Sequence, residues 1–461
     1  MSSFLFGYYD LGLRALSAAR LGLQISGDNI ANATTPGYSR RRMDLVPGSP
    51  VAVAGGYIDR GVEVARIRRM EDRFLQASLE RERGSLGGSK ESLRGLRDIE
   101  GLFGTVGGED ILSAYSRFSD AFAELSAAPD DPTLRKVAVL SADGLAQRIR
   151  ETYSRLEAQR RTENSAIAAG VGEVDRLADA LELLNDEIAG QEVGGVTSPL
   201  RDRRSQIVEQ LAELTGGTAS PAENGRILFS LPGGPTLVTG SGRVPLTTTR
   251  DFEGLYRISV NGIDVTDSLR QGKLGALLGL RDDAIPQRTA DLDKLATDLI
   301  SRANAITTAL QDLNGNPGGP LFVPNPPTAF KDASKIAVAT DILNDPRLLA
   351  ISTTGDAGDG SGAIDLAAIG NVRSIPLGSQ SATEFLATLR SVLGSQIVQA
   401  DVNHGVADGV VASLEAQRSS VTGVSLDEEA VELIRFQRSY EAAARFIQVL
   451  SEVTEIAVNL R

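Results

Sequence analysis

One run of the sequence, from about Thr133 to Ile188, has the apolar spacing of a single long α-helix. At 1.5 Å per residue such a helix would be about 80 Å long, which does not fit inside a compact globule. Its second half keeps a heptad register through Val174, Leu177, Leu181, Leu184 and Ile188. Further helices are predicted at 111–125, 200–214, 286–313 and 383–418. Several long helices imply a mainly α fold, built as an elongated antiparallel helical bundle.

The N-terminal segment also has helical spacing, along one narrow apolar stripe. Gly12, Gly22 and Gly27 each lower its helix propensity by about 1 kcal/mol relative to Ala. Residues 32–37, which include a Pro-Gly pair, end the helix. The stripe has the a/d spacing of a coiled coil and consists of Leu16, Ala19, Leu23, Ser26 and Ile30.

The last 37 residues have the clearest helical pattern in the chain. Ser425 and Glu428 have the spacing of a capping box, in which each side chain accepts from a free N–H group at the helix start. No Gly or Pro follows Leu426. An apolar stripe at three- and four-residue spacing continues to the end through Leu433, Phe436, Tyr440, Ala443, Ile447, Leu450, Thr454 and Ala457.

Residues 216–270 differ from the rest because they combine β-forming runs with turn residues. Asn261-Gly262 predicts a hairpin, since a type I′ turn needs two positive φ angles. We therefore expect a small β domain inserted into the bundle. The predicted organisation is terminal helical assembly segments at 1–45 and 420–461, a long-helix bundle at 46–215, 271–313 and 331–419, the β domain at 216–270 and a loop at 314–330.

Composition excludes several classes of function. The chain has no cysteine and one histidine, His404, which removes disulfides, thiolate chemistry and most transition-metal sites. We predict no catalytic site, metal or cofactor. The net charge of −13 argues against nucleic-acid binding, and no apolar run is long enough for membrane insertion. Two arginine clusters, at 40–42 and 66–73, are expected to form a solvated or subunit-facing surface.

The apolar stripes at the two chain ends have two interpretations. Chain ends usually fray, and a lone amphipathic helix of this length is marginal in water. Two such helices gain from burial only when they pair, either with each other in an intramolecular hairpin or with neighbouring subunits. We favour an assembly interface and assign to it Leu16, Ala19, Leu23, Ile30, Leu433, Phe436, Tyr440, Ile447 and Leu450.

The segment from Ser26 to Arg40 reads SGDNIANATTPGYSR and resembles the N-terminal signature of bacterial flagellar axial proteins. The run from Gly423 to Glu429, followed by Phe436 and Tyr440, is similar to their C-terminal signature. Interior segments at 61–75, 202–208, 272–296 and 312–315 narrow the resemblance to the flagellar hook-associated protein 1 family, which joins hook to filament.

Two departures from that family's pattern are visible. Ser205 stands where a second acid usually follows Asp202 and Arg204. The region from about 322 to 352 is short where longer members insert an additional outer domain, so we expect only one peripheral β domain.

The resemblance implies a structural, non-enzymatic subunit that leaves the cell unfolded through the flagellar type III apparatus and resides in the extracellular flagellum. It implies a homo-oligomeric ring at the hook–filament junction, lined by paired N- and C-terminal coiled-coil helices. The implied partners are hook protein, hook-associated protein 3 and an export chaperone that binds the C-terminal helix. The turn that leads into the bundle is expected to be set by Asn29, Asn32, Gly37 and Tyr38.

Three rival interpretations stay open at this point. A rod or hook protein, in the same class, would have a more β-rich body. A flagellar peptidoglycan hydrolase would need a catalytic acid in a substrate cleft. A coiled-coil secreted adhesin would serve attachment rather than filament assembly.

Overall fold

The computed structural model describes residues 2–53, 56–58, 60–104, 110–191, 197–324 and 333–459. The chain divides into two compact units. Unit 1 comprises Met1–Leu86, Glu173–Leu246 and Ala407–Arg461, and unit 2 comprises Gly87–Gly172 and Thr247–Val406. Three helices contribute to both units: α2 (Arg73–Phe103), α4 (Pro132–Gln191) and α10 (Ala382–Thr422).

Unit 1 contains both terminal helices, α1 (Ser2–Ala31) and α11 (Leu426–Asn459), together with α5 (Ser198–Thr215). An antiparallel ribbon follows α1 and pairs β1 (Arg41–Pro47) with β4 (Val62–Arg69). The short hairpin of β2 (Val51–Val53) and β3 (Gly56–Ile58) lies between them in sequence. A four-stranded meander completes the unit, in the order β5 (Thr218–Pro221), β6 (Ile227–Ser230), β7 (Thr236–Thr239) and β8 (Gly242–Arg243).

Unit 2 is built around one apolar core that α3 (Ile111–Ala127), α4 and α7 (Ile285–Ala309) share. The shorter helices are α6 (Gly272–Gly279), which a π-helical turn joins to α7, α8 (Thr340–Asn344) and α9 (Ser361–Ala368). A three-stranded sheet has the order β11-β10-β9, with β9 (Leu246–Arg250), β10 (Tyr256–Val260) and β11 (Ile263–Asp264). A separate hairpin pairs β12 (Phe322–Pro324) with β13 (Ile336–Val338).

The helical predictions agree with the structure in most places. α4 is one continuous helix of 60 residues, and the predicted mainly α fold with paired terminal helices is confirmed. The predicted helix at 286–313 ends earlier, at Ala309, because the chain after it turns to bridge Pro317 and Ser352 through Gln311. The predicted loop at 314–330 contains β12, and its last six residues lie outside the described part.

The β-rich segment at 216–270 folds into two sheets, and one helix holds both. In unit 1, the buried Asn185 of α4 donates to the Ile227 carbonyl at 2.8 Å and accepts from the Ile227 N–H at 3.2 Å. In unit 2, the buried Asn164 accepts from the Tyr256 N–H at 2.8 Å and donates to the Gly254 carbonyl at 3.2 Å. Each amide thus replaces a neighbouring strand at one point of its sheet.

The hairpin predicted within this segment is confirmed. β10 and β11 pair through Val260 and Ile263, and the two residues between them, Asn261 and Gly262, have φ angles of 51° and 77°. Positive φ at both central positions is what a type I′ turn requires.

Two elements of unit 1 were not anticipated from the sequence. The ribbon of β1 and β4 contains five arginines, which interrupt the apolar alternation that indicates a strand. The other is α2, none of which was predicted as a helix and which continues into unit 2. Within the part of the chain that the structure describes, no helix combines the length and apolarity needed to cross a membrane.

A buried arginine fixes the start of α4 in unit 2. Arg135 is almost fully buried, and its guanidinium donates to the carbonyls of Pro129 at 2.6 Å and Leu349 at 2.8 Å. Burial lowers the pKa of Arg135 below its ordinary value, because desolvation disfavours the charged form. These bonds connect the turn before α4 to the segment that enters the core after α8.

We predict that Arg135→Met destabilises unit 2 by about 2–4 kcal/mol, because it leaves buried carbonyls without a donor. Lys136→Met, at the next and exposed position, is the matched control. Thermal melting followed by circular dichroism measures the difference, and hydrogen exchange at residues 347–351 localises it. Equal melting curves for the two variants would contradict this role of Arg135.

Candidate assembly site at the chain termini

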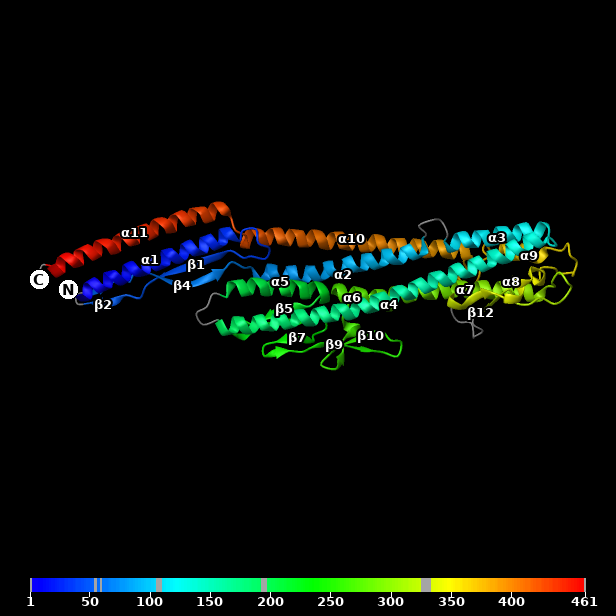
Figure 1. Ribbon diagram of the computed structural model, residues 1–461, viewed down its shortest axis with the longest axis horizontal. Helices are drawn as coiled ribbons and strands as arrows, with labels where there is room; N and C mark the ends of the chain where they lie inside the picture. The colour runs from blue at the N-terminus through cyan, green and yellow to red at the C-terminus, as the bar shows by residue number, and fades with distance from the viewer. Residues whose placement is uncertain are drawn as a thin grey trace. The chain divides into compact units, whose positions relative to one another are not determined.

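The first and last helices of the chain, α1 and α11, pack against each other in unit 1 and lie side by side in Figure 1. Two glycines of α1 permit the contact. A Cβ atom at Gly22 would lie 2.5 Å from the Phe436 ring, and one at Gly12 would lie 2.7 Å from the Ile447 side chain. The glycines that weaken α1 as a helix therefore make room for apolar side chains of α11.

The residues assigned to assembly are only partly covered in the single chain. Ala19 is buried, Ile30 and Tyr440 are exposed, and the others are half-buried: Leu16, Leu23, Leu433, Phe436, Ile447 and Leu450. The intramolecular pairing that the sequence left open is thus present. Because it covers these side chains incompletely, their role between subunits stays a prediction.

α11 carries a second apolar stripe that the sequence analysis missed. Phe446, Val449, Val453 and Ile456 repeat at three- and four-residue spacing and are 38, 55, 47 and 60% exposed. Each lies one position before a residue of the first stripe, which turns it by about 100° around the helix. α11 therefore has two apolar faces, and the second is open to solvent in the single chain. Two interleaved heptads in one helix were the signal that could have revealed it.

Asn29 is the centre of the junction between the two ends of the chain. Its side chain is 1% exposed and makes four hydrogen bonds. Nδ2 donates to the Arg41 carbonyl at 2.9 Å and to Glu429 Oε2 at 3.1 Å. Oδ1 accepts from the Tyr38 hydroxyl at 2.8 Å and from the Arg41 N–H at 3.0 Å. These four bonds use the full hydrogen-bonding capacity of a carboxamide.

Arg40 holds the start of α11 in the same junction. Its Nε donates to the buried Glu429 at 2.7 Å, and its Nη1 donates to Glu428 at 2.5 Å. Its backbone N–H donates to the Thr422 carbonyl at the end of α10. Half of the predicted capping box is present, since the Ser425 hydroxyl accepts from the Glu428 N–H at 3.5 Å. The other half was wrong, because the Glu428 carboxylate accepts from Arg40. A charged partner outcompetes the local cap.

The other predicted turn residues shape the loop between α1 and β1. Asn32 donates to the Asp28 carbonyl at 2.9 Å and so continues the hydrogen bonding of the last turn of α1. Gly37 has a φ of 78°, and a Cβ atom there would lie 2.2 Å from Gln206 Nε2. Burial raises the pKa of Tyr38, which keeps its hydroxyl protonated as a donor to Asn29. Asn32, Gly37 and Tyr38 thus lie in the loop after α1, and Asn29 lies in the last turn of that helix. Their role in assembly is a prediction.

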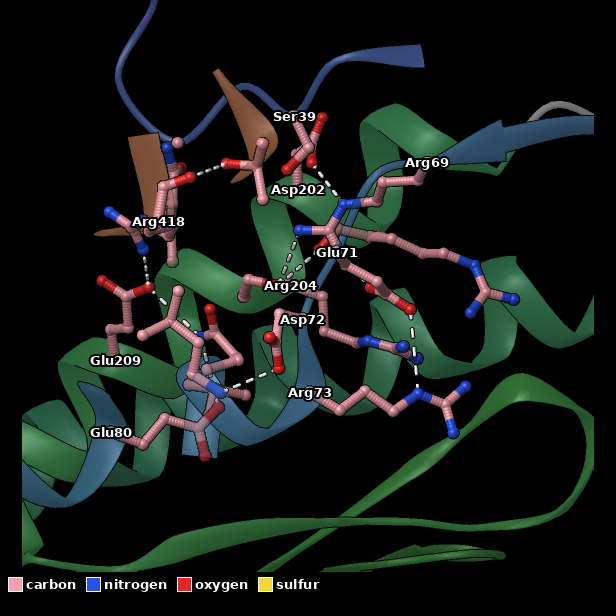
Figure 2. Close-up of a pocket in the computed structure, with 18 of the residues that line it drawn as sticks. Ser39, Arg69, Glu71, Asp72, Arg73, Glu80, Asp202, Arg204, Glu209 and Arg418 are labelled. Atoms are coloured by element: carbon pink, nitrogen blue, oxygen red, sulfur yellow. Dashed lines mark hydrogen bonds and ion pairs between the residues drawn. The ribbon is translucent and has the colours of Figure 1, made fainter. Parts of the chain in front are cut away.

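Beside this junction, unit 1 contains a groove of about 930 Å³ (Figure 2). It lies between the loop that joins α1 to β1, α5, β5 and the unit 1 ends of α2 and α10. Arg69 donates from Nε to Asp202 at 2.7 Å and from Nη2 to the Ser205 hydroxyl at 3.2 Å. Ser205, which replaces an acid of the family's pattern, therefore still binds this arginine. Arg204 donates to the Gly225 carbonyl at 2.7 Å. These bonds join α5 to β4 and to the turn before β6.

Glu80 is a buried acid in the same groove, only 5% exposed. It accepts from Gln76 at 3.2 Å and from the Ala219 N–H at 3.4 Å. Desolvation raises the pKa of Glu80 to about 7. Since β5 is an edge strand of its sheet, Glu80 occupies an N–H group that would otherwise be open to another strand.

Comparison with family models identifies the class of protein. The model described as "Flagellar hook-associated protein FlgK helical domain" matches residues 96–322. The model described as "Flagellar basal body rod FlgEFG protein C-terminal" matches residues 415–460, which contain α11. Paired terminal helices that end in this C-terminal region define a structural protein of the flagellar axis.

Curated relatives match the chain along almost its whole length. Flagellar hook-associated protein 1 of Escherichia coli K12 is 23% identical over 97% of this chain and 98% of its own. Its counterpart in Bacillus subtilis 168 is 25% identical over 97% of this chain and 96% of its own length. The structure of the flagellar hook junction protein FlgK from Burkholderia pseudomallei has the same fold, with a TM-score of 0.67 and 15% identity over 75% of this chain and all of that one.

The chain belongs to the flagellar hook-associated protein 1 (FlgK) family. The family is structural, which confirms the prediction of a non-enzymatic protein and contradicts the hydrolase alternative. The alignment to the Escherichia coli relative spans 544 residues, more than the 461 of this chain, so that relative contains residues that this chain lacks.

We predict that Gly22→Ala weakens the packing of α1 on α11, because the new Cβ atom forces the Phe436 ring to shift. Gly27→Ala is the matched control, since a Cβ atom there meets nothing within 4 Å and improves helix propensity by about 1 kcal/mol. Hydrogen exchange of the α11 amides near Phe436 is expected to accelerate in the first variant alone. Unchanged exchange in both would show that the close approach at Gly22 is not needed.

The raised pKa of Glu80 predicts a specific dependence of stability on pH. Because the folded chain binds this proton up to about pH 7 and the unfolded chain only to about 4.5, the free energy of unfolding falls as pH rises between those values. Glu80→Gln should therefore stabilise unit 1 at pH 8, by at most about 3 kcal/mol, and have little effect near pH 5. Glu82→Gln, at a half-buried position two residues along α2, is the control. Equal stabilisation at both pH values would contradict the raised pKa.

Proposed function

We propose that copies of this chain form a ring in which the α1–α11 pairs of neighbouring subunits pack side by side through the second stripe of α11. Membership of the family makes the chain a structural protein of the hook–filament junction, in the extracellular flagellum. The proposal concerns how it assembles there. It assigns the terminal helices to contacts between subunits and the rest of both units to the body of each subunit.

The single observation that carries the proposal is the exposed second stripe. Phe446, Val449, Val453 and Ile456 lie on one face of α11. Phe446 is at the edge of this face, next to Gly12 of α1, and the other three are more exposed. Full burial of one such side chain is worth about 1.5–3 kcal/mol, so four of them supply enough free energy for a specific contact. Their heptad-like spacing suits another helix as the cover. The half-buried first stripe adds to the same contact at its edges.

Family membership and the same exposed surface support a proposal for the individual binding partners. We propose that the ring contacts hook protein on one side and hook-associated protein 3 on the other. We also propose that an export chaperone binds α11 before secretion, because its apolar faces need cover in the cytosol. The absence of cysteine suits an unfolded chain that passes through the type III apparatus, since no disulfide can form on the way.

We predict that Val449→Glu combined with Val453→Glu abolishes assembly without unfolding the subunit, because it places two charges on the contact face. Gln448→Glu combined with Ser451→Glu adds the same charges at exposed positions outside the stripe. Purified full-length chains are added to hooks isolated from a strain that lacks this protein, which makes the result independent of export. Co-sedimentation with the hooks should fall at least tenfold for the first variant only.

Circular dichroism of both double variants checks that helix content is unchanged. If the Val449→Glu, Val453→Glu chain sediments with hooks as the wild type does, the second stripe is not the contact between subunits, and the proposed mode of assembly is wrong.

A further inference from the structure

We infer that the outer face of the β1–β4 ribbon is the docking surface for α11 of a second copy of this chain. The inference rests on the proposed function, and it names what covers the second stripe of α11 in the assembly. Both surfaces belong to unit 1 of their own copy.

The first observation is an unbalanced row of arginines on the ribbon. Arg42 lies directly opposite Arg68 in the antiparallel register, and Asp44 lies opposite Arg66. Like charges in opposite positions on one ribbon repel each other. Asp44 is 3.0 Å from Arg66 and 3.7 Å from Arg68, so one carboxylate serves two guanidinium groups.

These arginines are also accessible. The side chains of Arg66 and Arg68 are 68 and 47% exposed. Arg42 is exposed too, and no carboxylate of the described residues lies within ion-pair distance of it. Arg42 lines a pocket with acids at the start of α11 of its own chain, among them Glu428 and Glu432. Arg66 and Arg68 share the single carboxylate of Asp44, so these two guanidinium groups have charge left for carboxylates from outside the molecule.

The second observation is that the ribbon is thin and partly apolar. Two-stranded ribbons are marginally stable alone and need a partner for at least one face. α1 packs against β1 and β4 and provides one such partner. Leu45, Val46 and Val62 nevertheless are 39, 41 and 36% exposed. Successive side chains of a strand point to opposite faces, so Val46 shares the face of Arg42 and Asp44, whereas Leu45 does not. The arginine face of the ribbon therefore offers the exposed Val46 together with positive charge to a neighbour.

α11 has the complementary chemistry. From Phe446 to Asn459 it contains two acids, Glu452 and Glu455, and no basic residue. Both acids are exposed, as is Glu441 one turn earlier, and none of the three has an ion pair among the described residues. They lie on the same helix as the exposed stripe. α11 thus combines apolar side chains with unpaired carboxylates, and the ribbon combines an apolar side chain with two guanidinium groups that share one carboxylate.

The complementary surface must come from a second copy, because within one chain both surfaces are exposed at the same time. α11 is held on its own α1 by the first stripe, and the acids and the second stripe stay in solvent. A contact between two different patches of identical chains is heterologous, and repeated around an axis it closes a ring when the rotation between copies closes. The predicted contact therefore has the symmetry that the proposed assembly needs.

Cysteine cross-linking tests the contact directly, because the natural chain has no cysteine. Arg68→Cys is combined in turn with Glu441→Cys, Glu452→Cys and Glu455→Cys, and each chain is assembled onto isolated hooks and oxidised. At least one combination is expected to give covalent multimers beyond the dimer, which a heterologous contact allows. Arg81→Cys with Glu452→Cys is the control, since Arg81 is exposed on α2 outside the ribbon. Assembled chains that give no multimers in any ribbon combination would overturn the inference.

A charge exchange separates this partner from others. Arg42→Glu with Arg68→Glu should reduce co-sedimentation with hooks at least tenfold, and adding Glu452→Arg with Glu455→Arg should restore it. Loss without restoration assigns the ribbon to another protein, such as the hook subunit, and overturns the inference. Normal assembly of both the double variant and the quadruple variant, together with failure of Val449→Glu, Val453→Glu, would contradict the ribbon inference and leave the proposed function standing.

Discussion

A buried carboxamide has to satisfy four hydrogen-bonding positions, and Asn29 does so with groups from α1's own loop, from β1 and from α11. No other uncharged side chain of this size both donates twice and accepts twice. The buried Glu429 depends on it, since the carboxylate is neutralised by Arg40 and receives its remaining bond from Asn29. The two ends of the chain are therefore fixed to each other at one point, and the register of α1 on α11 follows from it.

From that point the two helices run side by side, and glycines of α1 allow them to approach closely. Gly12 and Gly22 let Ile447 and Phe436 approach the backbone of α1 closely. The contact covers one face of α11, and the second stripe lies beside that face. The same feature explains how one helix can bind its own chain and still present an apolar face. A wider intramolecular contact would have covered the face to which we assign assembly.

Periodicity predicted the long helices, because α4, α10 and α11 repeat their apolar residues over many turns. It could not predict the β1–β4 ribbon, whose arginines hide the alternation of a strand. Nor could it show that the segment at 216–270 makes two sheets. The two sheets form hydrogen bonds with Asn164 and Asn185 of α4, which is distant in the sequence. The junction residues Asn29 and Tyr38 were found through resemblance alone, and their bonds to Glu429 and each other are visible only in three dimensions.

The fixed junction also orients the ribbon relative to α11 of the same copy. Arg40 and Arg41 bind the start of α11 and Asn29, and the next residue, Arg42, is the first of the unbalanced arginines. Because the ribbon begins directly at the junction, its outer face has a defined orientation relative to α11 of the same copy. In the ring that we propose, a rigid pair of complementary patches sets the angle at which each copy docks on the next. Closure of a ring depends on that angle, so the hydrogen bonds of Asn29 act on the geometry of an assembly they do not themselves contact.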